Sequence, residues 1–472
     1  MLFKRPLSQA LLLCVIGSTA VYAQAQPQPP KPKKTASAAK SAKTAVPAKR
    51  AVAAAPKPAS RARVATAAAA GAVGVATVAT AGASAKAAVP APSAAEARLL
   101  HVIELVKRQE LDAALRAAAQ LTTDIPNFRA AQLVYADLLR FKTGRATGWA
   151  GAPAPEVMAL LAKHTPLDQT ALAPARHQEQ VQGLQKELQR RVKASGALPA
   201  AASVPREFQQ LGASVRHAVA IDASQSRLYL FAHEKGQLRL VRDFYVSIGK
   251  LGMGKSLEGD QRTPQGVYFI GRQIPGARLP DFYGKGALTL NYPNDWDRAL
   301  NRSGDGIWLH GSPPDQFARL PEASDGCIVL ANPDLIALMK TLDRQTPVLI
   351  SDKLQWTGPA ERAHARAGDA FVRVLDGWQQ AWKTADPRLL ARLYGSAPAA
   401  ERFPTVRLTE FFRLADIAVQ DLSVYAWKEA RGEIRIVEMQ LASRKAGRAL
   451  SLRQYWRRMG EHWQVLSEEV RG

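Results

Sequence analysis

The sequence predicts a multidomain protein with a helical module over residues 95–194, a β-rich domain over 215–352 and an α+β domain over 368–472. The division follows from the spacing of apolar residues, which recur every three to four positions in the first region and every second position in the next. The third region begins with a helical spacing and ends with strand-like runs, which is typical of an α+β domain. A length of 472 residues suits two to four domains of ordinary size.

The helical module is predicted from apolar residues at helical spacing, such as Leu99, Ile103 and Leu111. Pro126 begins a further helix, since proline is well tolerated in the first turn. Residues 195–205 are rich in Ala, Gly and Pro, so we expect a linker after the module. We expect the module to act as a spacer or to bind a partner.

The β-rich domain is predicted from strand-like alternation and from closely spaced glycines. Arg227–Phe231 and Gln237–Val241 flank Glu234-Lys235-Gly236 and are expected to pair as a hairpin. Phe244–Ile248 continues the alternation of apolar and other residues. We expect a helix at Pro333–Leu342 within this domain.

The α+β domain follows a polar connection over Trp356–Ala367. One apolar helix face runs through Phe371–Trp382, and a second runs through Leu389–Tyr394. The chain ends in three strand-like runs, Glu433–Ser443, Ala449–Arg457 and His462–Glu468. Helices followed by an antiparallel sheet favour a small α+β fold.

The N-terminal segment is typical of a secretory signal peptide over residues 1–23. Lys4 and Arg5 precede a short apolar run, and the segment ends at the small residue Ala23. The apolar run is too short for a comfortable membrane span, and the alternative is an uncleaved anchor. Residues 24–94 are rich in Ala, Pro and Lys and are expected to form a disordered tether. These features predict export to the periplasm or cell envelope, with no integral membrane span after signal cleavage.

The positive charge of the chain is concentrated near the N-terminus. The sequence has 64 basic and 40 acidic residues, which gives a net charge of +24. Residues 1–95 hold 13 of the basic residues and no acidic residue, which leaves a net charge of +11 for the rest. A charge of this size favours a polyanionic partner. Because the chain is expected to be exported, an anionic polymer of the envelope is favoured over nucleic acid.

The cysteine count excludes several classes of site. Two cysteines, Cys14 and Cys327, cannot form a disulfide framework, a thiolate zinc site or an iron–sulfur cluster. Cys14 would leave with the signal peptide, so the mature chain would keep Cys327 alone. A lone thiol in an oxidising compartment is either buried and inert or retained for its reactivity. The residues around Cys327 decide between these interpretations.

Two segments supply the groups that a cysteine nucleophile needs. His310 ends the apolar run Gly306–Leu309, and Cys327 follows Ser324-Asp325-Gly326. A thiolate nucleophile needs a base within hydrogen-bonding reach, and His310 would supply it. Backbone N–H groups of the Gly326–Cys327 turn would stabilise an oxyanion. On spacing alone, a core histidine and a buried thiol are an equally good interpretation.

These segments resemble the signature of L,D-transpeptidase (YkuD-like) catalytic domains, over about residues 215–351. His310-Gly311 followed by Ser324-Asp325-Gly326-Cys327 is similar to the catalytic motif of that family. Arg262–Tyr268 is similar to its core strands, and Leu290–Asn294 is similar to longer versions found in envelope cell-shape enzymes. The order of several independent motifs favours a catalytic role for Cys327 and His310.

The resemblance implies a peptidoglycan-modifying enzyme that needs no metal or organic cofactor. The Cys327 thiolate would attack the carbonyl after the L-centre of meso-diaminopimelate in a tetrapeptide stem. His310, oriented by the Gly311 carbonyl, would accept the thiol proton and pass it to the departing D-Ala amine, while the Gly326 backbone would lie at the oxyanion. Release of the acyl-enzyme by another stem's amine is L,D-transpeptidation, and release by water is L,D-carboxypeptidation.

Two positions depart from the pattern of the family. Asp325 stands where a His is common, and Val329 stands where an Arg often follows the cysteine. An anion beside the nucleophile would raise the thiol pKa unless it points away, so Asp325 is expected either to meet the diaminopimelate ammonium or to cap the turn. The candidates to replace the missing Arg are Arg262, Arg278 and Arg319. The predicted substrate-binding residues are Ser324, Asp325, Asn291, Tyr283 and Arg278, with packing as the alternative for Tyr283.

The C-terminal domain resembles SnoaL-like cone folds, which also occur as the C-terminal domains of helical-cell-shape L,D-carboxypeptidases. The resemblance lies in Trp378, Trp382, Asp386, Leu390 and Tyr394, with Gln454–Trp456 and Trp463 in the last strands. Such folds have a concave pocket that is often used for binding. The aromatic residues would either stack on sugar rings or pack in the core.

The function predicted from the sequence is therefore L,D-transpeptidation of peptidoglycan stems. One alternative is an L,D-carboxypeptidase that trims tetrapeptides to tripeptides, which the cone-fold domain and the altered cysteine motif favour. Another is a catalytically silent scaffold that binds peptidoglycan. Peptidoglycan peptide stems are the expected partner, and no nucleic acid is expected.

Overall fold

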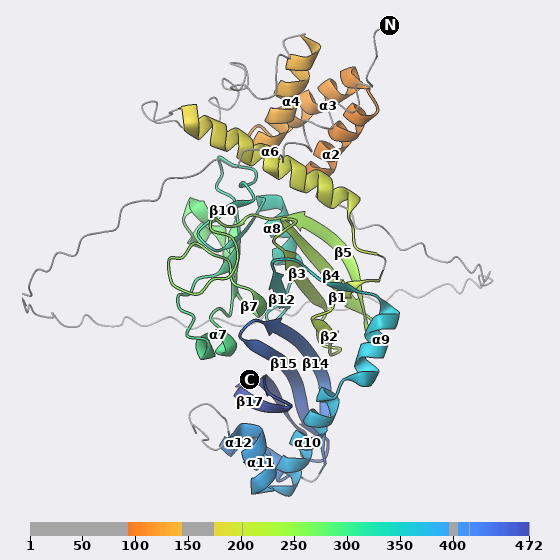
Figure 1. Ribbon diagram of the computed structural model, residues 1–472, viewed down its shortest axis with the longest axis vertical. Coiled ribbons are helices and arrows are strands. Elements are labelled where there is room, and N and C mark those ends of the chain that lie inside the picture. The colour runs from red at the N-terminus through yellow and green to blue at the C-terminus, as the bar shows by residue number, and fades with distance from the viewer. Residues whose placement is uncertain (1–92, 144–173, 201, 396–404, 415, 472) are drawn as a thin grey trace, which may run out of the picture. The chain divides into compact units, whose positions relative to one another are not determined.

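The computed structural model describes residues 93–143, 174–200, 202–395, 405–414 and 416–471 (Figure 1). The predicted signal peptide and nearly all of the predicted tether lie outside these ranges. The described residues form a helical region, a β-rich region and a C-terminal α+β region, which confirms the predicted fold class at this level.

The β-rich region is built on an eight-stranded sheet with the strand order β11-β9-β8-β7-β12-β3-β4-β5. Its strands are β3 (His217–Asp222), β4 (Arg227–Glu234), β5 (Gln237–Tyr245), β7 (Gly266–Pro275), β8 (Gly286–Leu290), β9 (Trp308–Gly311), β11 (Ile328–Leu330) and β12 (Pro347–Ser351). Neighbouring strands are antiparallel except for β11 with β9 and β12 with β3, which are parallel. The parallel pair β11 and β9 carries the two predicted catalytic segments.

Local sequence explains the predicted hairpin, which the structure confirms. Strands β4 and β5 pair through a turn at Lys235 and Gly236, which have φ angles of 51° and 74°. Two consecutive residues with positive φ give a turn whose twist matches that of the flanking strands.

Both faces of the sheet are covered. On one face, Leu335 and Leu338 of helix α8 (Asn332–Thr341) join a core with Leu288, Leu309 and Ile328. Short elements complete the region: β6 (Ile248–Gly249), η1 (Gly276–Arg278), η2 (Asp281–Tyr283), α7 (Asp295–Ala299) and β10 (Glu322–Ser324), which pairs with β6. The predicted helix at 333–342 is confirmed as α8.

The described helices of the N-terminal region are α2 (Ala94–Lys107), α3 (Leu111–Asp124), α4 (Arg129–Lys142) and α6 (Pro174–Gly196). Leu99, Leu121 and Leu133 pack with Leu184 and Leu188 of α6 in one core. Figure 1 shows α6 between helices α2–α4 and the β-rich region. Helix α6 therefore has one side toward the helical core and another toward the sheet.

A buried cluster of charged side chains joins the helical region to the β-rich region. Glu96 of α2 accepts hydrogen bonds from Arg191 of α6 at 3.0 Å and from Arg227 of β4 at 2.7 Å. Arg191 also pairs with Glu187 at 2.8 Å, and Arg227 pairs with Asp243 of β5. All five side chains are almost fully buried. Buried charges require such partners, because an unpaired one is strongly destabilising.

The C-terminal region is a curved antiparallel sheet with helices on one face. Its elements are α10 (Phe371–Thr384), α11 (Pro387–Tyr394), α12 (Thr405–Phe412), β14 (Ile417–Glu429), β15 (Gly432–Ser443), β16 (Arg448–Met459) and β17 (His462–Arg471). Trp378 and Trp382 of α10 pack with Phe412, Leu441 and Trp456 on the helical face. The other face carries Tyr425 and Tyr455, which join a core with residues of the β-rich region.

Two predicted connections contain regular structure that the sequence did not predict. The predicted linker at 195–205 ends in β1 (Val204–Pro205), which pairs with β13 (Trp356–Thr357), and β2 (Phe208–Gln210) then pairs with β14. The predicted polar connection at 356–367 forms β13 and helix α9 (Pro359–Gly368). Ala, Glu and Arg are strong helix formers, so a helix forms there without an apolar stripe.

The sequence prediction also missed strand β14, which lies between β15 and β2 in the C-terminal sheet. The register of β14 with β15 shifts between Gln420 and Ser423, and Asp421 has a φ of 50°. A bulge of this kind interrupts the alternation of side chains from which a strand is predicted.

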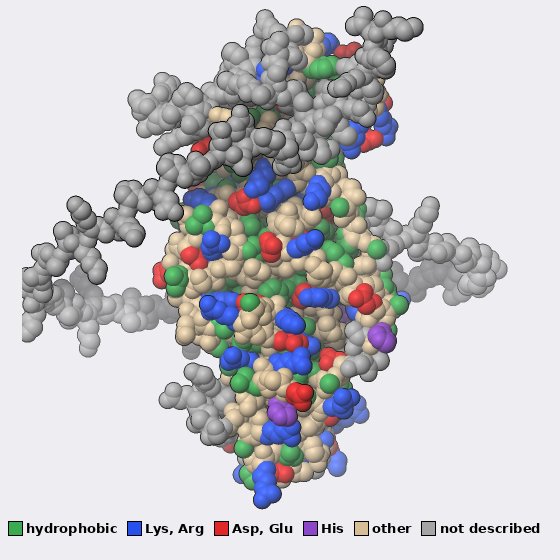
Figure 2. Space-filling model, viewed as in Figure 1, with side chains coloured by type: hydrophobic (Ala, Val, Ile, Leu, Met, Phe, Trp, Pro, Cys, Tyr) green, Lys and Arg blue, Asp and Glu red, His purple; other side chains and the backbone are tan. Residues whose placement is uncertain are grey.

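No helix among the described residues is long and apolar enough to cross a membrane. On the face shown in Figure 2, basic and acidic side chains are interspersed and do not gather into one basic field.

Candidate active site

Two adjacent parallel strands position the predicted catalytic residues: His310 lies in β9, and Cys327 directly precedes β11. In the register of β11 with β9, Ile328 is opposite Leu309 and Val329 is opposite His310. Cys327 directly precedes Ile328, so it lies at the edge of the sheet where β11 begins. His310 lies in β9, near its end. The fold therefore places residues that are 17 positions apart in the sequence on neighbouring strands.

The Cys327 thiol is held in a partly enclosed position. Its Sγ donates to the Gly306 carbonyl oxygen at 3.3 Å. Burial raises the pKa of the thiol, while the backbone N–H of Trp308 and the positive charge of Arg319 act to lower it. The thiol is therefore protonated at neutral pH, and the groups that favour the thiolate are already in place around it.

The His310 ring has one nitrogen fixed and is almost fully buried, with an exposure of 1%. Its Nδ1 lies 2.8 Å from the carbonyl oxygen of Gly311. Because a carbonyl only accepts hydrogen bonds, Nδ1 carries the proton and Nε2 keeps its lone pair. Burial lowers the pKa of His310 to about 4, so the ring is neutral at physiological pH. A neutral ring with a free Nε2 is a proton acceptor.

Aromatic residues of η2 cover the His310 ring. The ring of Phe282 lies 5.8 Å from the His310 ring, and that of Tyr283 lies 5.0 Å from it. Tyr283 also contacts Trp308 at 5.1 Å, and Phe282 is 44% exposed. Tyr283 is thus part of the wall of the site. This position suits both roles that the sequence predicts for it, substrate binding and packing.

The turn before Cys327 is shaped by Ser324 and Gly326. The Ser324 hydroxyl donates to the Cys327 carbonyl at 2.6 Å and accepts from the Gly326 N–H at 3.1 Å. Gly326 has a φ of 125°, and a Cβ there would lie 2.7 Å from the Arg262 carbonyl oxygen. Only glycine fits this turn without strain. Ser324 is buried, and both hydrogen bonds of its hydroxyl are made within the turn. In this structure the hydroxyl therefore stabilises the turn.

Asn332 is a residue of the site for which the sequence predicted no role, although the segment Leu330–Leu335 that contains it resembles the longer versions found in envelope cell-shape enzymes. Its side-chain oxygen accepts from the Lys285 N–H at 2.8 Å, and its amide donates to the Ser312 carbonyl at 2.8 Å. A Cβ on Gly311 would overlap this amide. Asn332 therefore ties the loop after η2 to the end of β9. The signal in the sequence is an Asn-Pro pair between an apolar strand and a helix.

The other predicted substrate-binding residues lie in different surroundings. Asp325 is exposed and accepts from Lys250 Nζ at 2.8 Å and from Gln261 Nε2 at 3.0 Å, and the Lys250 hydrogen bond lowers the pKa of Asp325. Arg278 is exposed at the end of η1. Asn291 accepts from the Phe269 N–H at 2.8 Å and lines a separate cavity.

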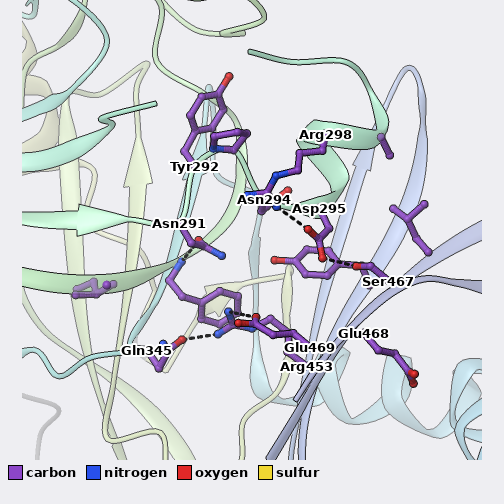
Figure 3. A pocket seen from close by; sticks show the side chains of 17 residues that line it. Asn291, Tyr292, Asn294, Asp295, Arg298, Gln345, Arg453, Ser467, Glu468 and Glu469 are labelled. Atoms are coloured by element: carbon purple, nitrogen blue, oxygen red, sulfur yellow. Dashed lines mark hydrogen bonds and ion pairs between the residues drawn. The ribbon is translucent and has the colours of Figure 1, made fainter. Parts of the chain in front are cut away.

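That cavity, of about 660 Å³, lies between the β-rich region and the C-terminal sheet (Figure 3). Its polar groups pair with one another across the junction. Arg453 donates to Gln345 at 2.7 Å, and the Ser467 hydroxyl donates to Asp295 at 2.5 Å. Cys327 and His310 are not among its lining residues. The cavity belongs to the junction of the two regions.

The described residues contain no group of three or more His, Cys, Asp or Glu side chains that is arranged to hold a metal ion. The chemistry available at the site is that of a thiol, a neutral imidazole and backbone N–H groups. Such a set suits acyl transfer through a thioester.

The chain is similar to several solved structures. The structure is similar to Bd1075 from Bdellovibrio bacteriovorus, with 24% identity, a TM-score of 0.45 and coverage of 57% of this chain and 98% of that chain. It is also similar to the helical cell shape determining protein Pgp2 from Campylobacter jejuni, with 20% identity, a TM-score of 0.43 and coverage of 56% and 96%. An L,D-transpeptidase (Yku) from Stackebrandtia nassauensis has 17% identity, a TM-score of 0.24 and coverage of 36% and 67%.

None of the curated proteins compared with the sequence matches it. The SnoaL-like cone fold of the C-terminal region stays a prediction. A family model for the L,D-transpeptidase catalytic domain, YkuD, matches residues 216–350, which span the sheet and both segments of the predicted motif. The family resemblance seen in the sequence is thereby confirmed, and this part of the chain is a YkuD-type L,D-transpeptidase catalytic domain.

Proposed function

We propose that this protein modifies peptidoglycan peptide stems through a Cys327 acyl-enzyme, with L,D-transpeptidation as its reaction. The observation that carries the proposal is the His310 ring. Its Nδ1 is fixed on the Gly311 carbonyl, which leaves Nε2 as the acceptor, and it lies on the strand beside the one that Cys327 precedes. A nucleophile, a base and a group that orients the base are the parts of a cysteine acyltransferase.

The proposed first step forms a thioester. The thiol proton moves to Nε2 of His310 as sulfur attacks the carbonyl after the L-centre of meso-diaminopimelate. The backbone N–H of Cys327 stabilises the oxyanion, because the N–H of Gly326 is already donated to the Ser324 hydroxyl. Collapse of the tetrahedral intermediate breaks the peptide bond, and His310 returns the proton to the amine of the departing D-Ala.

The second step distinguishes L,D-transpeptidation from L,D-carboxypeptidation. Attack on the thioester by the side-chain amine of another stem gives a cross-link and releases the Cys327 thiol. Attack by water gives a tripeptide, which is L,D-carboxypeptidation. His310 accepts the proton of the attacking group in both cases. We further propose that the protein acts in the cell envelope after export.

The local pKa values favour proton transfer that is concerted with attack. Burial raises the pKa of Cys327 and lowers that of His310, so a resting thiolate–imidazolium pair is unfavourable. The neutral pair needs the substrate carbonyl in place before charge develops. The charge then develops on an oxygen that faces the Cys327 N–H, where a low dielectric strengthens the interaction.

The test is incubation of the purified full chain with tetrapeptide-rich peptidoglycan, followed by mass spectrometry of the muropeptides. Cross-linked dimers support transpeptidation, and tripeptides with free D-Ala support carboxypeptidation. Cys327→Ala and His310→Gln should lower turnover by at least about 1,000-fold and 100-fold. His233→Gln is the matched control, because His233 Nδ1 makes the same kind of bond, to the Val215 carbonyl at 2.8 Å. If the wild-type chain leaves the muropeptides unchanged, the proposed enzymatic activity is refuted, and peptidoglycan binding without catalysis is the remaining function.

A further inference from the structure

The segment 312–323 runs from the end of the His310 strand to the turn that carries Cys327, and the helical region holds it along its length. At the start of the segment, Asn127 donates from its side chain to the Pro314 carbonyl at 2.9 Å. The Asn127 carbonyl accepts from the Phe317 N–H at 3.0 Å. The Phe317 ring lies 4.5 Å from that of Phe128 and packs against the core of the helical region.

Helix α6 holds the second half of the segment. Leu320 packs so closely on α6 that a Cβ added to Gly183 would lie within 2.5 Å of it. Glu322 pairs with Arg190 at 2.6 Å and with Lys186. Glu322 is the first residue of β10, two positions before Ser324, which shapes the catalytic turn. Contacts with the helical region therefore fix both halves of the segment.

Arg319 lies in this segment, and its guanidinium points back to the catalytic pair. The Arg319 carbonyl accepts from the Tyr245 hydroxyl at 2.9 Å, which fixes its backbone. The guanidinium lies 4.3 Å from the centre of the Phe282 ring, and the Phe282 ring contacts that of His310. Its Nη1 reaches the Ala323 carbonyl only at 3.5 Å, which is the limit of a hydrogen bond.

Among the described residues, the partly buried Arg319 guanidinium has no ion-pair partner. No carboxylate of the described residues lies within 4.0 Å of it. Burial lowers the pKa of Arg319, which reports that its charged form is disfavoured there. Other buried arginines of the chain, such as Arg227 and Arg453, have carboxylate partners. Burying a charge is costly unless it is paired, so the site favours an anionic group from a ligand.

The two other arginines near the site are less suited to this task. Arg262 donates from Nη1 to the Met253 carbonyl at 2.9 Å. Arg278 is exposed at the end of η1, where water screens its charge. Arg319 combines partial burial, a fixed backbone and a place beside the ring that covers His310.

We propose that Arg319 binds a free carboxylate of the substrate peptide and that the helical region holds it in place to do so. The inference rests on the proposed function and names a specificity residue for it. The ligand is a peptide with a carboxylate next to the scissile bond, either that of the terminal D-Ala or that of the D-centre of diaminopimelate. Guanidinium and carboxylate form paired, charge-assisted hydrogen bonds, which a carboxamide cannot replace.

The test uses three tetrapeptides: the free acid, the peptide amidated at the terminal D-Ala, and the peptide amidated at the D-centre of diaminopimelate. We expect the wild-type chain to discriminate against one of the amides by about 10- to 100-fold in kcat/KM. Arg319→Gln should lose that discrimination, and Arg319→Lys should keep part of it. Arg272→Gln is the matched control, because Arg272 is exposed on β7 of the same domain. Equal turnover of all three peptides, or discrimination that survives in Arg319→Gln, overturns the proposal.

Binding measured with Cys327→Ala separates this inference from the proposed function. If no peptide is bound or turned over, the proposed function fails and this inference fails with it. If the acid is bound and the amides are bound equally well, only the role of Arg319 is overturned.

The part played by the helical region has its own variant. Leu320→Ala removes the contact with α6 and should reduce the discrimination between acid and amide, with KM affected more than kcat. Leu354→Ala is the control, since it also shortens a leucine that packs in a hydrophobic core, but in a different cluster. Loss of discrimination in both variants, in proportion to lost stability, would refute the holding role.

Discussion

Glu96 is the residue whose replacement tests how the helical region is joined to the catalytic domain. Its carboxylate accepts from Arg191 at 3.0 Å and from Arg227 at 2.7 Å, with an exposure of 1%. Glu96→Gln removes the charge and keeps the shape. Each charge-assisted hydrogen bond contributes about 1.5–3 kcal/mol, and breaking a buried ion pair costs about 3–5 kcal/mol.

Two effects determine how large a loss of stability we expect within that range. Each arginine keeps one carboxylate, Glu187 for Arg191 and Asp243 for Arg227, so neither guanidinium is left unpaired. Glu96 also repels these carboxylates, and the repulsion helps to raise the pKa of each of them. Its removal relieves that repulsion. We therefore expect a destabilisation near the lower limit, about 3 kcal/mol.

The assay is hydrogen–deuterium exchange of peptides from α2 and α6 at pH 7, where opening of the helical region is measured directly. A loss of about 3 kcal/mol corresponds to exchange about 100-fold faster. Although burial acts to raise it, the two arginines lower the pKa of Glu96 below its ordinary value of 4.5. The stabilisation is therefore complete above about pH 4.5 and is lost as the pH falls through the lowered pKa.

Glu104→Gln is the control for this prediction, because Glu104 pairs with Lys107 and Arg108 on the exposed surface of the same helix. Exposed pairs contribute about 0–1 kcal/mol, so exchange should change by less than about fivefold. Exchange in α2 of Glu96→Gln within threefold of the wild-type rate would refute the reasoning. The cluster would then not couple the two regions.

Three further predictions concern the catalytic turn and the C-terminal region. Gly326→Ala places a Cβ 2.7 Å from the Arg262 carbonyl at a φ of 125°, so turnover should fall at least 10-fold, whereas Gly358→Ala, with open space around it, should be silent. Alkylation of Cys327 by iodoacetamide should still accelerate above pH 9, because burial raises the thiol pKa above its ordinary value of 9.0, and a midpoint below pH 8 would contradict this. Burial raises the pKa of Glu468 to about 7, so its stabilisation is complete below about pH 4.5 and is lost as the pH rises through 7. Glu468→Gln should therefore raise the thermal unfolding temperature relative to wild type more at pH 8.5 than at pH 5, and an equal difference at both would count against it.

Local patterns were enough to predict much of the fold. The hairpin of β4 and β5 and helix α8 follow from alternation, turn residues and helical spacing within a few positions. Strand β14 was missed because its bulge at Asp421 breaks the alternation. Helix α9 was missed because it has strong helix formers but no apolar stripe.

Some residues of the site can be predicted from the neighbouring sequence, and others are positioned by contacts with distant parts of the chain. His310 and Cys327 are visible in the sequence because each lies in a short motif. The position of Arg319 depends on contacts with Asn127 and α6, which lie more than 100 positions earlier in the chain. No local pattern encodes such contacts. The same holds for Asn291. The sequence predicts it as a substrate-binding residue, but it faces the junction with the C-terminal sheet.

The pKa of Cys327 depends on burial and on charges supplied by separate segments of the chain. Asp325, two positions before the nucleophile, acts to raise the thiol pKa, but it is exposed and paired with Lys250 and Gln261. Arg319 acts in the opposite direction from the segment that the helical region holds. Burial exceeds both effects, so the thiol stays protonated until a substrate arrives. The thiolate is the form that oxidises, and a protonated thiol is therefore suited to the oxidising compartment in which we propose that the protein acts.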